Sequence, residues 1–185
     1  DAKDDDGMPS QEVQLSNAAR KVLQAADLVI VAPGNTWGSI LPVLATPGLS
    51  DEVKDKKLVY VMPFFNRTDV AQTKGWNVQQ YVKVYNSYLQ RGPDAVVVNS
   101  RCTQHVPGYE WVQTSSSRIN IVSGTNGKAN FDDSNSEELE GVRVIASPYA
   151  LGNLVDPVDG DTIQRNPVQM DLQAIKLTLL KLFLE

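Results

Sequence analysis

Residues 26–42 read ADLVIVAPGNTWGSILP, and this stretch decides the fold. Its residues 28–32 are apolar without alternation, which predicts a strand covered on both faces, as in the parallel sheets of α/β proteins. Pro33 and Gly34 end that strand, and a helix is expected soon after them. The order of strand, tight turn and helix is typical of one unit of an α/β domain.

The turn between this strand and its helix carries the small polar side chains of Asn35, Thr36 and Ser39. Backbone N–H groups at a helix N-terminus lack partners inside the helix and lie at the positive end of its dipole, so they favour anions. We therefore hypothesise that the turn holds a phosphate of a nucleotide-like ligand. The alternative is a plain strand-to-helix connection with a Ser/Thr cap, and the pattern alone does not decide between the two.

The composition is that of a soluble globular protein. The 185 residues are 42% hydrophobic and 21% charged, which fits one domain with a buried core. No apolar run is long enough to cross a bilayer, and the net charge of −5 argues against broad binding of nucleic acid. A single cysteine, Cys102, excludes an internal disulfide. We expect a cytoplasmic protein that binds neither membranes nor nucleic acid.

The rest of the chain alternates helices and strands. Strands are expected at residues 28–32, 58–62, 94–98 and 141–145. Helices are expected to begin at the caps Asn17, Asn77 and Asn166. This alternation predicts a Rossmann-like, doubly wound and mostly parallel α/β sheet.

Two segments depart from the alternation. Residues 101–135 are rich in turn-forming residues and are expected to form an irregular insertion at the sheet edge, where 110–113 and 118–122 pair as a small antiparallel hairpin. Residues 1–10 are acidic and polar, which indicates a flexible tail. We therefore expect a single α/β domain over residues 1–185.

Parallel sheets of this type bind ligands beyond the carboxyl ends of their strands. The connection at residues 63–76, after the second strand, is longer than most, and long connections on that side often carry function. We expect this connection, the turn at 33–39 and Asn99 to lie at one rim of the sheet.

Other chemistries have little support in the sequence. Cys102 and His105 are too few for a structural zinc site, and a Cys–His nucleophile at these positions is a weak alternative. Asp156, Asp159 and Asp161 lack the spacing of a calcium loop. No metal ligand and no catalytic residue is assigned.

The stretch APGNTWGSILPVLATPGL resembles the motif GPGSLYTSIIPNLLVPGI, and DAVVVN resembles the strand DYVIVN, both of the CofD-like family. Five stretches of the chain, in the same order and spacing, carry this resemblance. The family includes the 2-phospho-L-lactate transferases of deazaflavin-coenzyme synthesis and the YvcK-type gluconeogenesis factors. The stretch KKLVYVMPFFNRTDVAQTKGWNVQQYVKVYNSYL resembles KVYVCNLMTQPGETDGYTVSDHVKAL. The resemblance covers about residues 11–100 and 140–184.

The resemblance implies a set of ligand-binding residues. Trp37 stands where YvcK-type proteins have a tyrosine associated with nucleotide-sugar binding, and an aromatic ring there can stack on a base or a sugar. Thr68 and Thr73 stand at matching positions of the long connection. The full candidate set for a phosphate-bearing ligand is Gly34, Asn35, Thr36, Trp37, Ser39, Thr68, Thr73 and Asn99.

The sequence also departs from the family pattern. The family's glycine-rich GGGTG loop and its Asp/Asn-rich metal-binding region are not found in this sequence, so the resemblance implies the C-terminal portion of a longer CofD-like chain. Arg67, Gln72 and Lys74 replace a methionine and two acids of the family motif. These replacements suit an anionic ligand, and surface drift explains them equally well.

The resemblance implies two alternative functions. The first is a regulator that binds a nucleotide sugar or a related diphosphate. The second is a transferase that moves a phospho-hydroxyacid group from a nucleotide diphosphate conjugate to a deazaflavin-type alcohol, with Mg²⁺. Asp69 is the only acid within residues 63–76, which favours the binder. The expected partner is a nucleotide-diphosphate small molecule, and a homodimer is left open.

Overall fold

The computed structural model describes residues 13–100, 105–112, 139, 141–154 and 168–184. Its helices are α1 (Asn17–Ala25), α2 (Leu41–Leu44), α3 (Leu49–Val53), α4 (Val78–Leu89) and α5 (Leu172–Leu184), with a π-helical turn η1 (Thr36–Ile40) before α2. Its strands are β1 (Leu28–Val31), β2 (Lys57–Val61), β3 (Phe65–Arg67), β4 (Ala95–Asn99), β5 (Tyr109–Trp111), β6 (Arg143–Ser147), β7 (Ala150–Leu154) and β8 (Val168–Met170).

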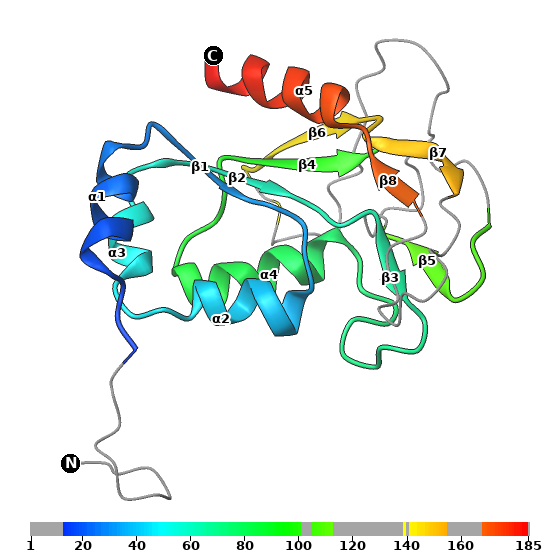
Figure 1. The fold of residues 1–185 in the computed structure, drawn as a ribbon, viewed down its shortest axis with the longest axis horizontal. Helices are drawn as coiled ribbons and strands as arrows, with labels where there is room; N and C mark the ends of the chain where they lie inside the picture. The colour runs from blue at the N-terminus through cyan, green and yellow to red at the C-terminus, as the bar shows by residue number, and fades with distance from the viewer. Residues whose placement is uncertain (1–12, 101–104, 113–138, 140, 155–167, 185) are drawn as a thin grey trace, which may run out of the picture.

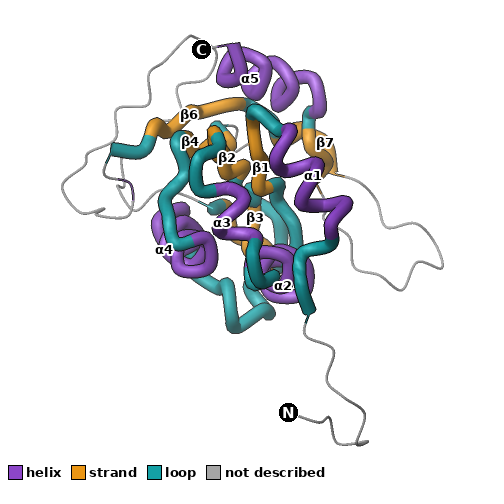
Figure 2. The backbone as a smooth tube through the Cα atoms, turned by 90° about the vertical axis from the view of Figure 1, so that its left-hand side faces the viewer, coloured by secondary structure: helices purple, strands orange, loops and turns teal. Residues whose placement is uncertain are grey.

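A parallel sheet with the strand order β1-β2-β4-β6 forms the centre of the molecule. Each neighbouring pair runs parallel, with Val59 beside Ala95 and Val97 beside Ile145. Helix α5 lies on one side of this sheet, and α2, α3 and α4 lie on the other (Figure 1 and Figure 2). The predicted mostly parallel α/β fold is therefore confirmed.

The central position of β2 and β4 in the sheet explains why their sequences are apolar without alternation. In β2, Leu58 and Tyr60 pack toward α2, α3 and α4, whereas Val59 and Val61 pack toward α5. Successive side chains of a strand point to opposite faces, so a strand covered by helices on both sides needs apolar residues at every position. Leu58, Val59 and Tyr60 are all completely buried, as predicted for this strand.

Strand β1 differs from this prediction. It lies at one edge of the sheet, beside β2 only, and Ile30 is 40% exposed. The prediction of a strand covered on both faces was therefore wrong for β1, although the strand itself is present at Leu28–Val31. An apolar run alone does not distinguish an edge strand from a central one.

Two small antiparallel pairs lie beside the main sheet. Strand β3 pairs with β5, with Phe65 opposite Trp111, and β7 pairs with β8. The predicted hairpin of residues 110–113 with 118–122 stays a prediction, while residues 109–111 pair with a strand inside the 63–76 connection. Residues 118–122, the expected partner, lie outside the described residues, as does the expected tail at 1–10.

Of the three predicted helix caps, the structure confirms the one at α4. Asn77 caps α4 as expected, through a capping box in which Asn77 Oδ1 accepts from Gln80 N and Gln80 Oε1 accepts from Asn77 N. The cap of α1 is Ser16 and not Asn17. The last helix begins at Leu172 and not at Asn166, because the Asp171 carboxylate accepts from two N–H groups of its first turn.

No helix in the described part of the chain is both long enough and apolar enough to cross a membrane.

Replacing Asn77 by alanine should lower the free energy of unfolding by about 1 kcal/mol, since the capping box at the start of α4 is lost. Urea unfolding followed by circular dichroism measures this loss. The Asn77→Ser variant keeps a capping oxygen and is expected to retain most of the stability. Equal unfolding midpoints for Asn77→Ala and the wild type would contradict the role of this cap.

Candidate functional site

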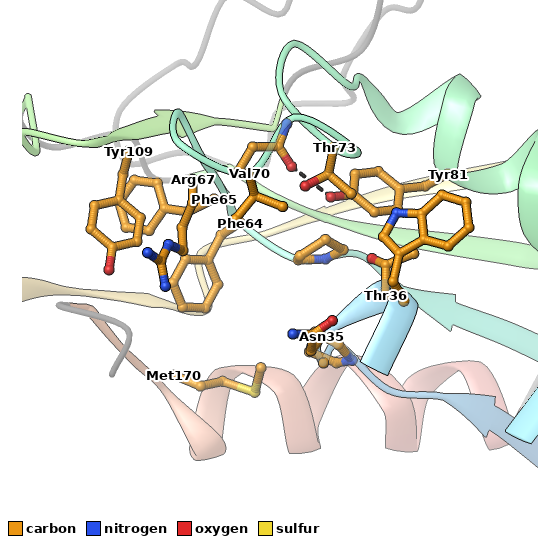
Figure 3. Close-up of a pocket in the computed structure, with 15 residues that line it drawn as sticks. Asn35, Thr36, Phe64, Phe65, Arg67, Val70, Thr73, Tyr81, Tyr109 and Met170 are labelled. Carbon is orange, nitrogen blue, oxygen red and sulfur yellow. Dashed lines mark hydrogen bonds between the residues drawn. The ribbon is translucent and has the colours of Figure 1, made fainter. Parts of the chain in front are cut away.

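A cavity of about 520 Å³ lies where β1 and β2 end at their carboxyl termini. Residues 33–37 form one wall, and the long connection after β2 forms another, while Tyr109 and Met170 reach it from other segments (Figure 3). This is the edge of a parallel sheet at which ligands bind in α/β proteins. The volume is within the usual range for small-molecule sites.

The turn at residues 33–37 is organised by Asn35. Its Oδ1 accepts a hydrogen bond from Gly38 N at 2.8 Å, and its carbonyl oxygen accepts from Ser39 N and Ile40 N. Asn35 is therefore the N-cap of η1. The Thr36 and Trp37 N–H groups, at the first two positions of this turn, have no acceptor within it, so the turn retains donors for an anion.

The buried side chain of Asn66 holds the long connection after β2 in place. Its Nδ2 donates to the Trp76 carbonyl at 2.7 Å, and its Oδ1 accepts from the Tyr81 hydroxyl at 2.5 Å. Asn66 is 2% exposed, so these bonds form out of contact with water. The connection is thus fixed to α4 beside the cavity and is not a free loop.

Aromatic rings extend from the cavity wall into the core. Trp37 is 46% exposed, and its ring centroid lies 6.2 Å from that of Trp76 in an edge-to-face arrangement. Trp76 lies 5.2 Å from Tyr81 in the same geometry. Contacts of this kind limit the freedom of an aromatic side chain, and they leave part of the Trp37 ring open to stack on a planar ligand group.

Burial raises the pKa of the Tyr81 hydroxyl to about 12, and the neighbouring Tyr85 adds to the effect. The hydroxyl is thus protonated at neutral pH and donates to Asn66. This is a positioning role, because the proton is engaged in holding the connection and is not available to a ligand.

The structure brings together some of the predicted site residues. Gly34, Asn35, Thr36, Trp37 and Thr73 all line the cavity.

Ser39, Thr68 and Asn99 do not line it. The Ser39 N–H bonds back to the Asn35 carbonyl, the Thr68 N–H donates to the Gly108 carbonyl, and Asn99 Oδ1 accepts from Ala150 N. Ser39 lies within η1, Thr68 follows β3, and Asn99 is the last residue of β4, so these groups bond to neighbouring backbone.

Several cavity residues were missed in the prediction. They are Pro63, Phe64, Phe65, Asn66, Arg67, Val70, Tyr81, Tyr109 and Met170. The length of the 63–76 connection was the available signal for most of them, and Arg67 was noted as a gained cation. Tyr109 and Met170 come from segments far along the chain, and no local pattern connects them to the turn.

The described residues contain no group of three His, Cys, Asp or Glu that could hold a metal ion. Asp69, the acid of the 63–76 connection, is engaged by Arg67. No Mg²⁺ site is therefore assigned to these residues. His105 is exposed, while Cys102 and the three aspartates at 156, 159 and 161 lie outside the described residues.

A family model described as 2-phospho-L-lactate transferase CofD matches residues 6–148, more than half of the chain. The chain belongs to the CofD family.

Two relatives are gluconeogenesis factors by name. A putative gluconeogenesis factor of Thermotoga maritima is 26% identical over 140 residues, which cover 76% of this chain and 40% of the relative. The gluconeogenesis factor of Bacillus subtilis is 34% identical over 82 residues, or 43% of this chain and 25% of the relative.

A crystal structure of a Bacillus halodurans protein matches 93% of this chain and 47% of its own, with a TM-score of 0.62 and 16% identity. A second crystal structure of the same Bacillus halodurans protein, described as a member of the upf0052 family, has a TM-score of 0.60. At this identity the likeness shows the fold alone. The CofD-family chain spans less than half the length of each of these relatives.

The raised pKa of Tyr81 predicts how stability depends on pH. Above about pH 10 the unfolded chain loses the Tyr81 proton, whereas the folded chain keeps it until about pH 12. The stabilising effect of the neutral hydroxyl is therefore complete below pH 10 and is lost as the pH rises toward 12. Between pH 9 and 11, the free energy of unfolding should fall by about 1 kcal/mol less in Tyr81→Phe than in the wild type.

Urea titrations at the two pH values measure this difference. Tyr88→Phe, which removes the hydroxyl of a 37% exposed tyrosine on the same helix, is the matched control. If Tyr81→Phe loses as much stability as the wild type over this interval, burial of the Tyr81 hydroxyl does not have the stated effect.

Proposed function

We propose that this CofD-family chain binds a phosphate-bearing nucleotide conjugate, such as a nucleotide sugar, and that it serves a regulatory role in metabolism. The ligand would occupy the cavity beside residues 28–41. The observation that carries this proposal is the cavity itself, which joins the turn at residues 33–37 to the connection after β2.

One wall of the cavity, the turn at residues 33–37, suits both parts of such a ligand. The Thr36 and Trp37 N–H groups at the start of η1 are donors for a phosphate. The half-exposed Trp37 ring is a stacking surface for a base or a sugar. Both features lie on one short turn, so a nucleoside diphosphate could contact them together.

A metabolic role is suggested by relatives, since the matched proteins of Thermotoga maritima and Bacillus subtilis are named as gluconeogenesis factors. Binding without turnover is also consistent with the neutral, protonated state of Tyr81 and with the pairing of Asp69 to Arg67. Among the described residues that line the cavity, no carboxylate or histidine is available as a general base.

A second candidate is a transferase, because the matching family model is described as 2-phospho-L-lactate transferase CofD. In this alternative the same cavity would hold the nucleotide diphosphate conjugate, and Mg²⁺ would supply charge neutralisation at the transferred group. A Mg²⁺-dependent product from a deazaflavin-type alcohol would favour the transferase. Saturable binding without product would favour the regulator.

The Trp37→Ala variant should bind nucleoside diphosphate sugars roughly tenfold more weakly than the wild type, since a stacking surface is removed. Isothermal titration calorimetry with UDP-, GDP- and ADP-linked sugars measures the affinity. Trp37→Phe keeps an aromatic ring and should recover much of the loss.

Val43→Ala is the matched control for this change. Val43 is 60% exposed on the adjoining helix α2 and does not line the cavity, so its loss should leave the affinity within twofold of the wild type. If Trp37→Ala binds as well as Val43→Ala, the stacking role of Trp37 is wrong. If no sugar conjugate binds the wild type, the proposed function is wrong.

A further inference from the structure

Arg67 is the only charged side chain among the described residues that line the cavity. It stands at the end of β3, where β3 pairs with β5, and its guanidinium lies beside Phe65 and Tyr109 (Figure 3). A single cation in a cavity otherwise lined by aromatic and neutral polar groups favours an anionic ligand. The planar fork of arginine binds two oxygens of one phosphate at once.

Asp69 already engages this fork. Arg67 Nε donates to Asp69 Oδ1 at 2.9 Å, and Arg67 Nη2 donates to Asp69 Oδ2 at 2.6 Å. These are the two parallel bonds that a phosphate would also form. Asp69 itself does not line the cavity, so an acid from outside neutralises the cation within it.

The pair is suited to exchange. The Asp69 side chain is 63% exposed and that of Arg67 is 35% exposed, and ion pairs in contact with water are held weakly. The hydrogen bonds from Arg67 also lower the pKa of the Asp69 carboxyl, so Asp69 remains ionised near neutral pH. A change of pH in that range therefore does not release Arg67, and a competing anion can.

We propose that Arg67 binds a phosphate group of the ligand, and that Asp69 is a built-in competitor which holds the same guanidinium until that phosphate displaces it. The step is an exchange of one ion pair for another, with no covalent change. The nucleotide part of the ligand rests on the proposed function, whereas the phosphate part can be tested with an inorganic anion.

The exchange makes the cavity selective for anions that can form two hydrogen bonds to the Arg67 guanidinium. A neutral nucleoside cannot displace Asp69, and an anion must form both bonds to the fork to do so. The device therefore favours a diphosphate over weaker anions and lowers the affinity for all of them by the strength of the Arg67–Asp69 pair.

Calorimetric titration with inorganic pyrophosphate tests the exchange in the whole chain. Asp69→Asn should bind pyrophosphate about fivefold more tightly than the wild type, because the competitor is removed. Arg67→Gln should bind roughly tenfold more weakly, because the fork is lost. In the double variant the gain from Asp69→Asn should disappear, since it acts only through Arg67.

Two variants match these changes in charge. Lys74→Gln removes one positive charge from the same connection, and Asp27→Asn removes one negative charge at the opposite end of β1. Neither residue lines the cavity, so both variants should bind pyrophosphate within twofold of the wild type. These two controls distinguish the loss of a direct contact with Arg67 from the effect of a change in net charge.

The proposal is overturned if Arg67→Gln binds pyrophosphate as the wild type does, or if Asp69→Asn gives no gain. If the Arg67 and Asp69 variants change the affinity for malonate, a dicarboxylate, as much as the affinity for pyrophosphate, the assignment to phosphate is wrong. A chain that shows the pyrophosphate pattern but binds no nucleoside diphosphate sugar would disprove the proposed function and leave the Arg67–Asp69 exchange standing. If nucleoside diphosphate sugars bind Arg67→Gln as tightly as the wild type, the proposed function stands and the Arg67–Asp69 exchange is disproved.

Discussion

The site depends on two hydrogen bonds made by one buried amide. Asn66 joins the strand β3 to the Trp76 carbonyl and to the Tyr81 hydroxyl on α4. A buried amide left without these partners would cost free energy, so the bonds fix the course of the connection after β2. Because that connection is fixed, Arg67 and Thr73 stand at the cavity wall opposite the turn formed by residues 33–37.

The central sheet supplies the constraint on the other side. β2 and β4 are buried on both faces, and the Tyr149 hydroxyl donates to the Met62 carbonyl just beyond the end of β2. A rigid strand end allows the turn after β1 and the connection after β2 to face each other across the cavity. The site is thus formed by connections that extend from the ends of a densely packed and therefore rigid sheet.

Much of this arrangement could be predicted from the sequence, because it follows from local patterns. The apolar runs of β2 and β4 and the cap at Asn77 identified strands and a helix, and the rule for parallel sheets placed their ends together. Tertiary pairing could not be predicted in this way. The partner of β5 is a three-residue strand inside a connection that reads as a loop, and the last helix begins after Asp171 and not at Asn166.

The placement of the aromatic residues has an optical consequence. Each of the chain's three tryptophans either lines the cavity or packs against an aromatic residue that lines it. Trp37 lines it, Trp76 lies against Trp37, and Trp111 lies 4.1 Å from Phe65, which is another cavity residue. The tryptophan fluorescence of this chain therefore comes from rings at or next to the candidate site, so a ligand that enters the cavity is expected to change it.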